Sequence, residues 1–299
     1  MAYKPSPKSK GILDRAWNWI QSVEYQVTVR WVFYRLLQDG IYSEKKGYRH
    51  LLSLTSKARK GFYAGWRPWT LADDTRAPIL MQRQGFYGLH LRGHGFQDED
   101  DWLARIKEEI NCPLDRWASQ PIYSEIWFEA AAMQGQFLHY ANENMPLLAF
   151  RGDISIPEKW RSAERLAERY QDLGAPIHIY YFGDYDPKGL LIPASAWRDI
   201  LAWTIVILNS KGLTKLEALE SLAFHRVGIN REQIEELRLP ENPERSGTYQ
   251  WEALDDNQAR QLISRANELL AMDRFAGIKE DEELITDRFK QKLTGGEHG

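Results

Sequence analysis

The sequence has little cysteine and no long uninterrupted apolar run. One cysteine, Cys112, in 299 residues excludes an internal disulfide framework and fits a reducing compartment. No run of about 18 apolar residues is present, as a membrane-spanning helix would need. The first ten residues lack the apolar segment of a signal peptide. We therefore expect a cytoplasmic protein with no membrane segment, and its length and 43% hydrophobic content allow two domains.

Charge is unevenly distributed along the chain. Residues 1–67 hold 13 Lys and Arg against four acids, a net charge of +9, so the remainder carries −12 to give the total of −3. A basic part joined to an acidic part is typical of a polyanion-binding module attached to a domain of another kind. The alternative is a basic surface that simply faces solvent. We favour nucleic-acid binding by the N-terminal part.

The N-terminal part has a helical hydrophobic pattern. We expect helices over 10–23, 28–39 and 48–60, followed by a short aromatic hairpin at 62–69. Helix, turn, helix and a β-hairpin form a winged-helix pattern, in which the second helix of the pair can enter the major groove of DNA. A plain helical bundle with a basic surface is the alternative.

The hydrophobic pattern changes from helical to alternating strands and helices after residue 118, where we place a domain boundary. Apolar strands are expected at 122–128, 146–150 and 177–182, with helices between and after them. This β-α-β-α-β-α order is typical of a parallel sheet with crossover helices. The sequence therefore predicts an α/β protein, with an N-terminal winged-helix domain and linker at 1–118 and a mostly parallel α/β domain with a C-terminal helical extension at 119–299.

Acidic side chains follow two of the predicted strands. Glu129 comes directly after the first, and Asp184 and Asp186 follow the third in the stretch GDYDPKG. The carboxyl ends of strands in open parallel sheets form a ligand crevice, so the three carboxylates should converge. Carboxylate oxygens suit Mg²⁺ or Mn²⁺. The alternative is that the two aspartates are turn and helix-capping residues.

A strand that ends in Glu and a later strand that ends in Asp-x-Asp resemble the Toprim domain of topoisomerases, primases and some nucleases. With a basic winged helix upstream, GDYDPKG resembles more specifically the A subunit of topoisomerase VI. That group includes the meiotic double-strand-break proteins and the short Mini-A proteins. Further similarity lies in TVRWVFYRL, HRVGINREQI, RLPENPE and WEALDDNQARQLISRANELL, and the resemblance covers roughly residues 28–273.

The resemblance implies a mechanism. Tyr34 matches the tyrosine that attacks a DNA phosphodiester, Arg30 matches the motif arginine, and Glu129, Asp184 and Asp186 match the Mg²⁺ ligands. A phenol has an ordinary pKa near 10, so Tyr34 would need a base or a cation nearby. Its neighbours at i−4 and i+4, Arg30 and Gln38, indicate a wetter helix face, although Tyr34 can equally be a structural aromatic. Some relatives have a lysine after the Toprim Glu, and this sequence has none there.

Three functions remain open at this point. The first is Mg²⁺-dependent cleavage of double-stranded DNA through Tyr34, and the second is a Toprim nuclease that uses metal-activated water. The third is a DNA-binding protein without catalysis. By analogy with the group we expect a homodimer in which the tyrosine of one subunit approaches the metal of the other, a separate ATPase or accessory subunit, and a nucleoid-associated location.

Roles are also predicted for Glu252 and for a group of basic side chains. Glu252 is either an auxiliary acid of the site or a carboxylate at a helix end. The side chains predicted to contact DNA are Arg30, Arg35, Arg49, Lys57, Arg59, Lys60 and Lys188.

Overall fold

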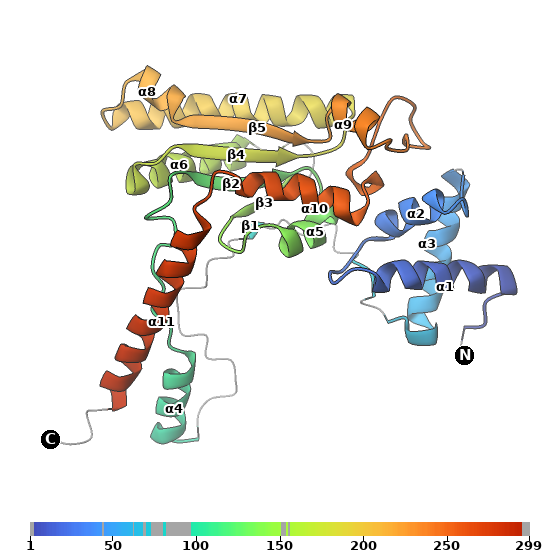
Figure 1. Ribbon diagram of the computed structural model, residues 1–299, viewed down its shortest axis with the longest axis horizontal. Helices are drawn as coiled ribbons and strands as arrows, with labels where there is room; N and C mark the ends of the chain where they lie inside the picture. The colour runs from blue at the N-terminus through green and yellow to red at the C-terminus, as the bar shows by residue number, and fades with distance from the viewer. Residues whose placement is uncertain are drawn as a thin grey trace.

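The computed structural model describes residues 3–43, 45–61, 63–67, 70–72, 80–81, 97–150, 154 and 156–294. These residues form an α/β protein with a helical N-terminal part beside a mixed α/β part (Figure 1). The α/β class predicted from the sequence is therefore confirmed.

Three helices make up the N-terminal part: α1 (Pro7–Gln21), α2 (Val29–Gln38) and α3 (Lys45–Lys60). The side chain of Thr28 caps α2 by accepting a hydrogen bond from the backbone N–H of Trp31 at 3.1 Å. Gly40 follows the helix at φ +72°, a left-handed conformation that glycine adopts without strain. Both ends of α2 are thus fixed by local sequence.

The prediction of an aromatic hairpin at 62–69 is wrong for the residues of it that the structure describes, 63–67. Residues Tyr63–Gly65 form a 3-10 turn, and Trp66 is buried against the helices instead of lying on a strand. Phe62, Pro68 and Trp69 lie outside the described residues. The turn packs its rings inward, because Trp17 and Trp66 contact each other at 5.6 Å between ring centroids.

The sheet has five strands in the order β1-β3-β2-β4-β5. Four of them run parallel, and β1 pairs antiparallel at the edge. The bounds are β1 Leu80–Met81, β2 Tyr123–Phe128, β3 Leu147–Ala149, β4 Ile177–Phe182 and β5 Leu222–Gly228. The three strands expected from the sequence, β2, β3 and β4, are confirmed. Strand β5 was not predicted from the sequence, because the polar residues His225 and Arg226 interrupt its apolar pattern.

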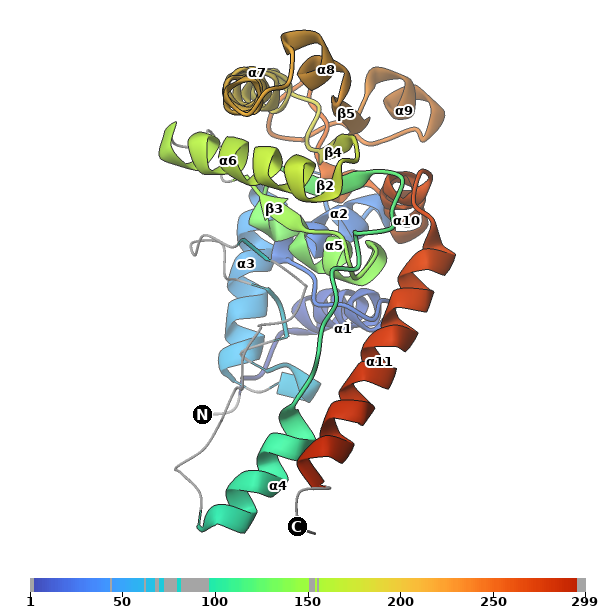
Figure 2. The ribbon, with the colours of Figure 1, turned by 90° about the vertical axis from the view of Figure 1, so that its left-hand side faces the viewer.

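Helices cover both faces of the sheet (Figure 2). Trp127 of β2 contacts Trp197 of α7 on one face, where α6 and α7 pack together. Phe128, the next residue, stacks on Phe137 of α5 on the other face, where α10 also lies. The bounds are α5 Gln134–Tyr140, α6 Ile156–Leu173, α7 Pro187–Ser210 and α10 Asp256–Ser264. Two short helices flank β5 along the chain: α8 (Lys215–Glu220) precedes it and α9 (Arg231–Glu236) follows it.

Two clusters of buried residues form the core. One runs from Ile12 to Leu71 and holds the three N-terminal helices together. The other runs from Trp117 to Phe275 and fills both faces of the sheet. Trp117 precedes the predicted boundary at 118 by one residue and already belongs to the second cluster.

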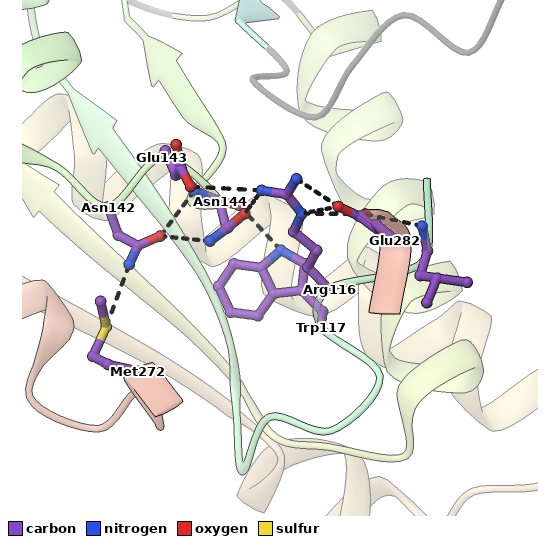
Figure 3. Close-up of polar contacts among 8 residues, drawn as sticks. Arg116, Trp117, Asn142, Glu143, Asn144, Met272 and Glu282 are labelled. Atoms are coloured by element: carbon purple, nitrogen blue, oxygen red, sulfur yellow. Dashed lines mark hydrogen bonds and ion pairs between the residues drawn. The ribbon is translucent and has the colours of Figure 1, made fainter. Parts of the chain in front are cut away.

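Helices α4 (Glu99–Glu109) and α11 (Met272–Thr294) extend away from the sheet side by side (Figures 1 and 2). The stretch before residue 118, expected to be a linker, is fixed to the middle of α11. Arg116 pairs with Glu282 at 2.7 Å and donates to the side chain of Asn144, and the indole of Trp117 donates to the Asn144 carbonyl (Figure 3). The stretch is therefore irregular in backbone but tied to its surroundings.

Helix α7 is the one helix of the described residues that is long and apolar enough by composition to cross a membrane. Its run is interrupted by Arg198 and Asp199, and Asp199 pairs with Lys159 of α6 at 3.1 Å. The buried side of α7 packs on α6 and the sheet, with Ala196 and Ile200 fully covered. One side of α7 is therefore packed against the protein, while Leu191 and Val206 on the helix are exposed.

A buried ion pair joins β2 to α6. The carboxylate of Glu125 is 1% exposed and accepts two hydrogen bonds from Arg165, each at 2.9 Å. The hydroxyl of Tyr123 and the indole of Trp127 donate to the same carboxylate. Burial alone would raise the pKa of Glu125, but Arg165 and these donors lower it overall. These three side chains together compensate the charge of Glu125 inside the protein.

Removing one partner of this pair should be costly. We expect Arg165→Met to lower the free energy of unfolding by about 3–5 kcal/mol, because Glu125 would remain buried without its counter-charge. The matched control is Arg161→Met on the same helix, whose pair with Glu158 is exposed and worth less than about 1 kcal/mol. Urea denaturation of both variants measures the difference. Equal losses in the two variants would contradict the importance of the buried pair.

Candidate functional site

The site lies at the carboxyl ends of β2 and β4. In the sheet order, β2 is flanked by β3 on one side and β4 on the other, so the crossover direction reverses between β2 and β4. Ligands of open α/β sheets bind in the crevice at such a switch point. Glu129 follows β2 directly and Asp184 follows β4, and the N-terminal helices lie beyond these strand ends (Figure 1).

The carboxylate of Glu129 contacts the backbone of Asp184. The backbone N–H of Asp184 donates to Glu129 Oε2 at 2.8 Å. Glycines at 183 and 189 leave room for this carboxylate, since a Cβ at either position would lie 2.7–2.8 Å from Glu129 Oε2. The glycines of GDYDPKG therefore serve a close approach to Glu129.

Asp186 takes a different direction. It caps α7 by accepting a hydrogen bond from the N–H of Gly189 at 2.7 Å, and its second oxygen lies 3.7 Å from Arg245. Between the two aspartates, Tyr185 pairs with Tyr249 as an isolated antiparallel bridge. The alternative interpretation of Asp186 as a helix-capping residue is thus confirmed, while Asp184 faces Glu129.

Arg226 of β5 holds the 183–189 turn through hydrogen bonds to its backbone. Its guanidinium donates to the carbonyl oxygens of Gly189 at 2.8 Å and Asp184 at 2.7 Å. Burial raises the pKa of Glu129, and the positive charge of Arg226 opposes part of that rise. The sequence reasoning missed this residue, because β5 was not expected and Arg226 precedes the strand end by two residues.

The segment Tyr249–Leu254 lies between the aspartate turn and α2. On one side, the N–H of Trp251 donates to Asp184 Oδ1 at 2.8 Å. On the other side, Arg35 donates to the carbonyl of Glu252 at 3.0 Å and to that of Leu254, and Gln38 donates to the carbonyl of Ala253 at 3.1 Å. One short segment therefore contacts both the carboxylates and the helix that holds Tyr34.

Tyr34 faces this segment. Its hydroxyl donates to the side-chain oxygen of Gln250, and the residue is 1% exposed. The expectation that Tyr34 lies on a wetter helix face is wrong, because the Tyr249–Leu254 segment covers that face. Burial, and then the charges of Glu252 and Asp184, raise the pKa of the phenol. Tyr34 thus lies close to the carboxylates of its own chain.

Arg30 lies one helical turn before Tyr34 and is half exposed. Its guanidinium is 3.7 Å from Glu252 Oε1, and this carboxylate raises the pKa of Arg30. A pocket opens between the two parts of the chain here, lined by Arg30, Phe33, Tyr34, Tyr48, Asn242, Pro243, Glu244 and Gln250. Arg30 and Tyr34 therefore border one hollow surface next to the carboxylates.

The carboxylates repel one another. Burial, followed by the charges of Glu252 and Glu129, raises the pKa of Asp184 well above its ordinary value. Burial also raises the pKa of Glu129 against the opposing hydrogen bond from the Asp184 N–H. Such shifts mean that the charged forms are under-compensated by the protein.

The oxygen atoms that this site offers are of the kind that a hard divalent cation such as Mg²⁺ binds. The site offers carboxylate oxygens alone, and Glu252 Oε1 is buried without a hydrogen-bond partner among the described residues. As placed, no group of three or more His, Cys, Asp or Glu side chains in the described part of the chain is arranged to hold a metal ion. Glu129 and Asp184 would hold the cation first, and Asp186 would have to turn from its capping position.

The predicted DNA contacts divide into three groups. Arg49 and Lys57 of α3 and Lys188 at the start of α7 are exposed, as expected. Arg35 is a correction: it is 1% exposed and donates to backbone carbonyls of the 249–254 segment, so it does not reach DNA. Arg59 is half-buried, and the side chain of Lys60 lies outside the described residues.

Comparison with protein-family models, with curated proteins and with solved structures finds no match for this chain. The assignment of a function therefore depends on the geometry of the site and on the sequence resemblance.

Neutralising Asp184 should stabilise the metal-free protein. A raised pKa in the folded state favours the native protein at low pH, and this contribution disappears as the pH rises past that pKa. We expect Asp184→Asn to raise the free energy of unfolding at pH 7 by about 1–3 kcal/mol, and to have little effect below about pH 4. The Asn oxygen still accepts from Trp251, and Asp287→Asn on the exposed side of α11 is the control. Urea unfolding as a function of pH measures this, and a loss of stability at pH 7 would contradict it.

Gly189 should not tolerate a side chain. A Cβ there would lie 2.4 Å from the carbonyl oxygen of Asp184 and 2.8 Å from Glu129 Oε2. We expect Gly189→Ala to cost about 1–3 kcal/mol in unfolding free energy. Gly11→Ala, at an open position of α1, should be neutral or stabilising by up to about 1 kcal/mol. Thermal unfolding of both variants is the measurement, and equal behaviour would argue against the close approach.

Proposed function

We propose that this chain is a Mg²⁺-dependent DNA-cleaving enzyme of the topoisomerase VI A type, with a winged-helix-like N-terminal part and a Toprim-like α/β part. The observation that carries the proposal is the position of Tyr34. Residues 34, 129 and 184 were selected by the resemblance from distant parts of the sequence, and the fold brings them to the two sides of one six-residue segment.

The N-terminal part offers a surface for DNA. It carries a net charge of +9 over residues 1–67, and α3 turns Arg49 and Lys57 to solvent. Helix α3 would be the recognition helix, and Arg30 would reach the phosphate next to Tyr34 with its planar guanidinium. Lys188 would add a further phosphate contact at the start of α7.

The chemistry is a transesterification. The oxygen of Tyr34 attacks a backbone phosphorus and the phosphorus–O3′ bond breaks, leaving a 5′-phosphotyrosyl link and a 3′-hydroxyl. The phenol proton passes to a nearby base or water, and the departing O3′ takes up a proton. Arg30 holds the phosphate, and Gln250 orients the phenol through its hydrogen bond. A bound Mg²⁺ or Mn²⁺ would supply stabilisation of the negative charge that builds on the phosphate oxygens.

A second candidate function is a Toprim nuclease that uses metal-activated water. The observation that favours it is the state of Tyr34, whose hydroxyl is buried and already donates to Gln250. In that case Tyr34 is a structural aromatic, and the cut ends carry no protein. DNA binding without cleavage, the third alternative, predicts salt-sensitive binding alone.

The proposal also includes two protein partners, a second copy of this chain and a separate ATPase subunit. The proposed site is assembled from residues of a single chain, so a tyrosine donated by a second subunit is not needed for its geometry. A homodimer would instead pair two such sites across a duplex to cut both strands. A separate ATPase subunit would be required for any ATP-driven strand passage.

Plasmid cleavage separates the three functions. Supercoiled DNA is incubated with protein and Mg²⁺ or Mn²⁺, quenched in detergent, and analysed with and without protease. We expect wild type to yield nicked or linear DNA that carries covalent protein until protease is added. Tyr34→Phe and Asp184→Ala should both lose this product, because one lacks the nucleophile and the other a cation ligand. Tyr42→Phe, outside the site, is the control and should cut like wild type.

Other outcomes assign the alternatives. If Tyr34→Phe still cuts and only Asp184→Ala is inactive, the protein is a metal-dependent nuclease. If no variant cuts and wild type binds duplex DNA in a salt-dependent way, the protein acts by binding alone.

A further inference from the structure

Glu252 is the buried carboxylate that neither the fold nor the resemblance gives a role. It is 4% exposed and lies in the Tyr249–Leu254 segment, one residue after the Trp251 whose N–H binds Asp184. A carboxylate in this position loses its hydration and needs compensation from the protein. Its burial is as complete as that of the core residues around it.

The compensation that Glu252 receives is poor. Its Oε1 atom accepts no hydrogen bond from the described residues, and the guanidinium of Arg30 lies 3.7 Å from it, beyond hydrogen-bond distance. Glu125, another buried glutamate of the described residues, accepts four hydrogen bonds from three side chains. Glu252 is therefore a buried acceptor that lacks a donor.

Glu252 also lies next to the proposed cation site, because its neighbour Trp251 donates its backbone N–H to Asp184 Oδ1 at 2.8 Å. Burial, followed by the charge of Glu252, raises the pKa of Asp184, which accords with this position. A divalent cation bound by two neighbouring buried carboxylates compensates the charge of both. The same cation would supply the missing partner of Glu252 Oε1.

We propose that Glu252 is a further carboxylate ligand of the divalent cation, beside Asp184, and that cation binding releases Arg30 from its ion pair. This inference rests on the proposed function, because it uses the same cation site. Arg30 compensates Glu252 while no cation is present. Once a cation takes over that compensation, the half-exposed guanidinium can turn to a DNA phosphate at the pocket, so the cation prepares the protein for DNA.

Mn²⁺ binding to the full chain without DNA tests this directly. Free Mn²⁺ is measured by electron paramagnetic resonance during titration of wild type, Glu252→Gln, Asp184→Asn and Glu236→Gln. We expect the affinity to fall more than about tenfold in Glu252→Gln and in Asp184→Asn. Glu236→Gln, on the exposed side of α9, should bind like wild type. Wild-type affinity in Glu252→Gln would overturn the proposal.

A second variant separates a ligand from a structural ion pair. Arg30→Gln removes the competing cation, so we expect it to bind Mn²⁺ as tightly as wild type or up to several-fold more tightly. If Glu252 merely held Arg30 in place, neither Glu252→Gln nor Arg30→Gln would change Mn²⁺ affinity, and that result would also overturn the proposal. Circular dichroism confirms that each variant is folded.

The two proposals fail in different ways. If Asp184→Asn binds Mn²⁺ like wild type, the cation site itself is misplaced and both proposals fall. If Asp184→Asn loses binding while Glu252→Gln keeps it, the site stands and only the role of Glu252 is refuted.

Discussion

The contact between helix α2 and the Tyr249–Leu254 segment is the interaction on which the proposed site depends. Arg35 anchors it by donating to two backbone carbonyls, and Gln38 adds a third bond. The segment is held on its far side by Trp251, whose N–H binds Asp184 and whose indole donates to Gln136 at 2.7 Å. This contact places α2 beside the acidic crevice, and Tyr25, which donates to Asp256 and accepts from Gln136, joins the two parts of the chain at a second place.

The interaction also explains why an arginine is buried at position 35. Burial lowers the pKa of this guanidinium to about 10. Its Nη2 group donates to the carbonyl oxygens of Glu252 and Leu254, whereas its Nε is buried without a hydrogen-bond partner among the described residues. A charged donor binds carbonyls more strongly than a neutral one. The cost of burying Arg35 is thereby partly offset, and the position of Tyr34, one residue earlier on the helix, becomes fixed relative to Asp184.

Local patterns predicted much of this structure. The helix that begins near residue 28, the strands β2 and β4, and the position of Glu129 next to Asp184 follow from sequence periodicity and from the rule that parallel strands end at one edge. The environment of Tyr34 did not, because a segment more than 200 residues away covers its helix face. Arg35 was misjudged for the same reason, and β5 was missed because His225 and Arg226 hide its strand pattern.

The most direct test of the account is whether α2 and the 249–254 segment meet within one chain. Gln38→Cys and Ala253→Cys are introduced together in a chain with Cys112 replaced by Ser, and a short bismaleimide is added. Mass spectrometry of the products should show a cross-link between positions 38 and 253 inside single chains, independent of protein concentration. Cross-links only between chains, or none at these positions, would contradict the central claim that one chain assembles the site.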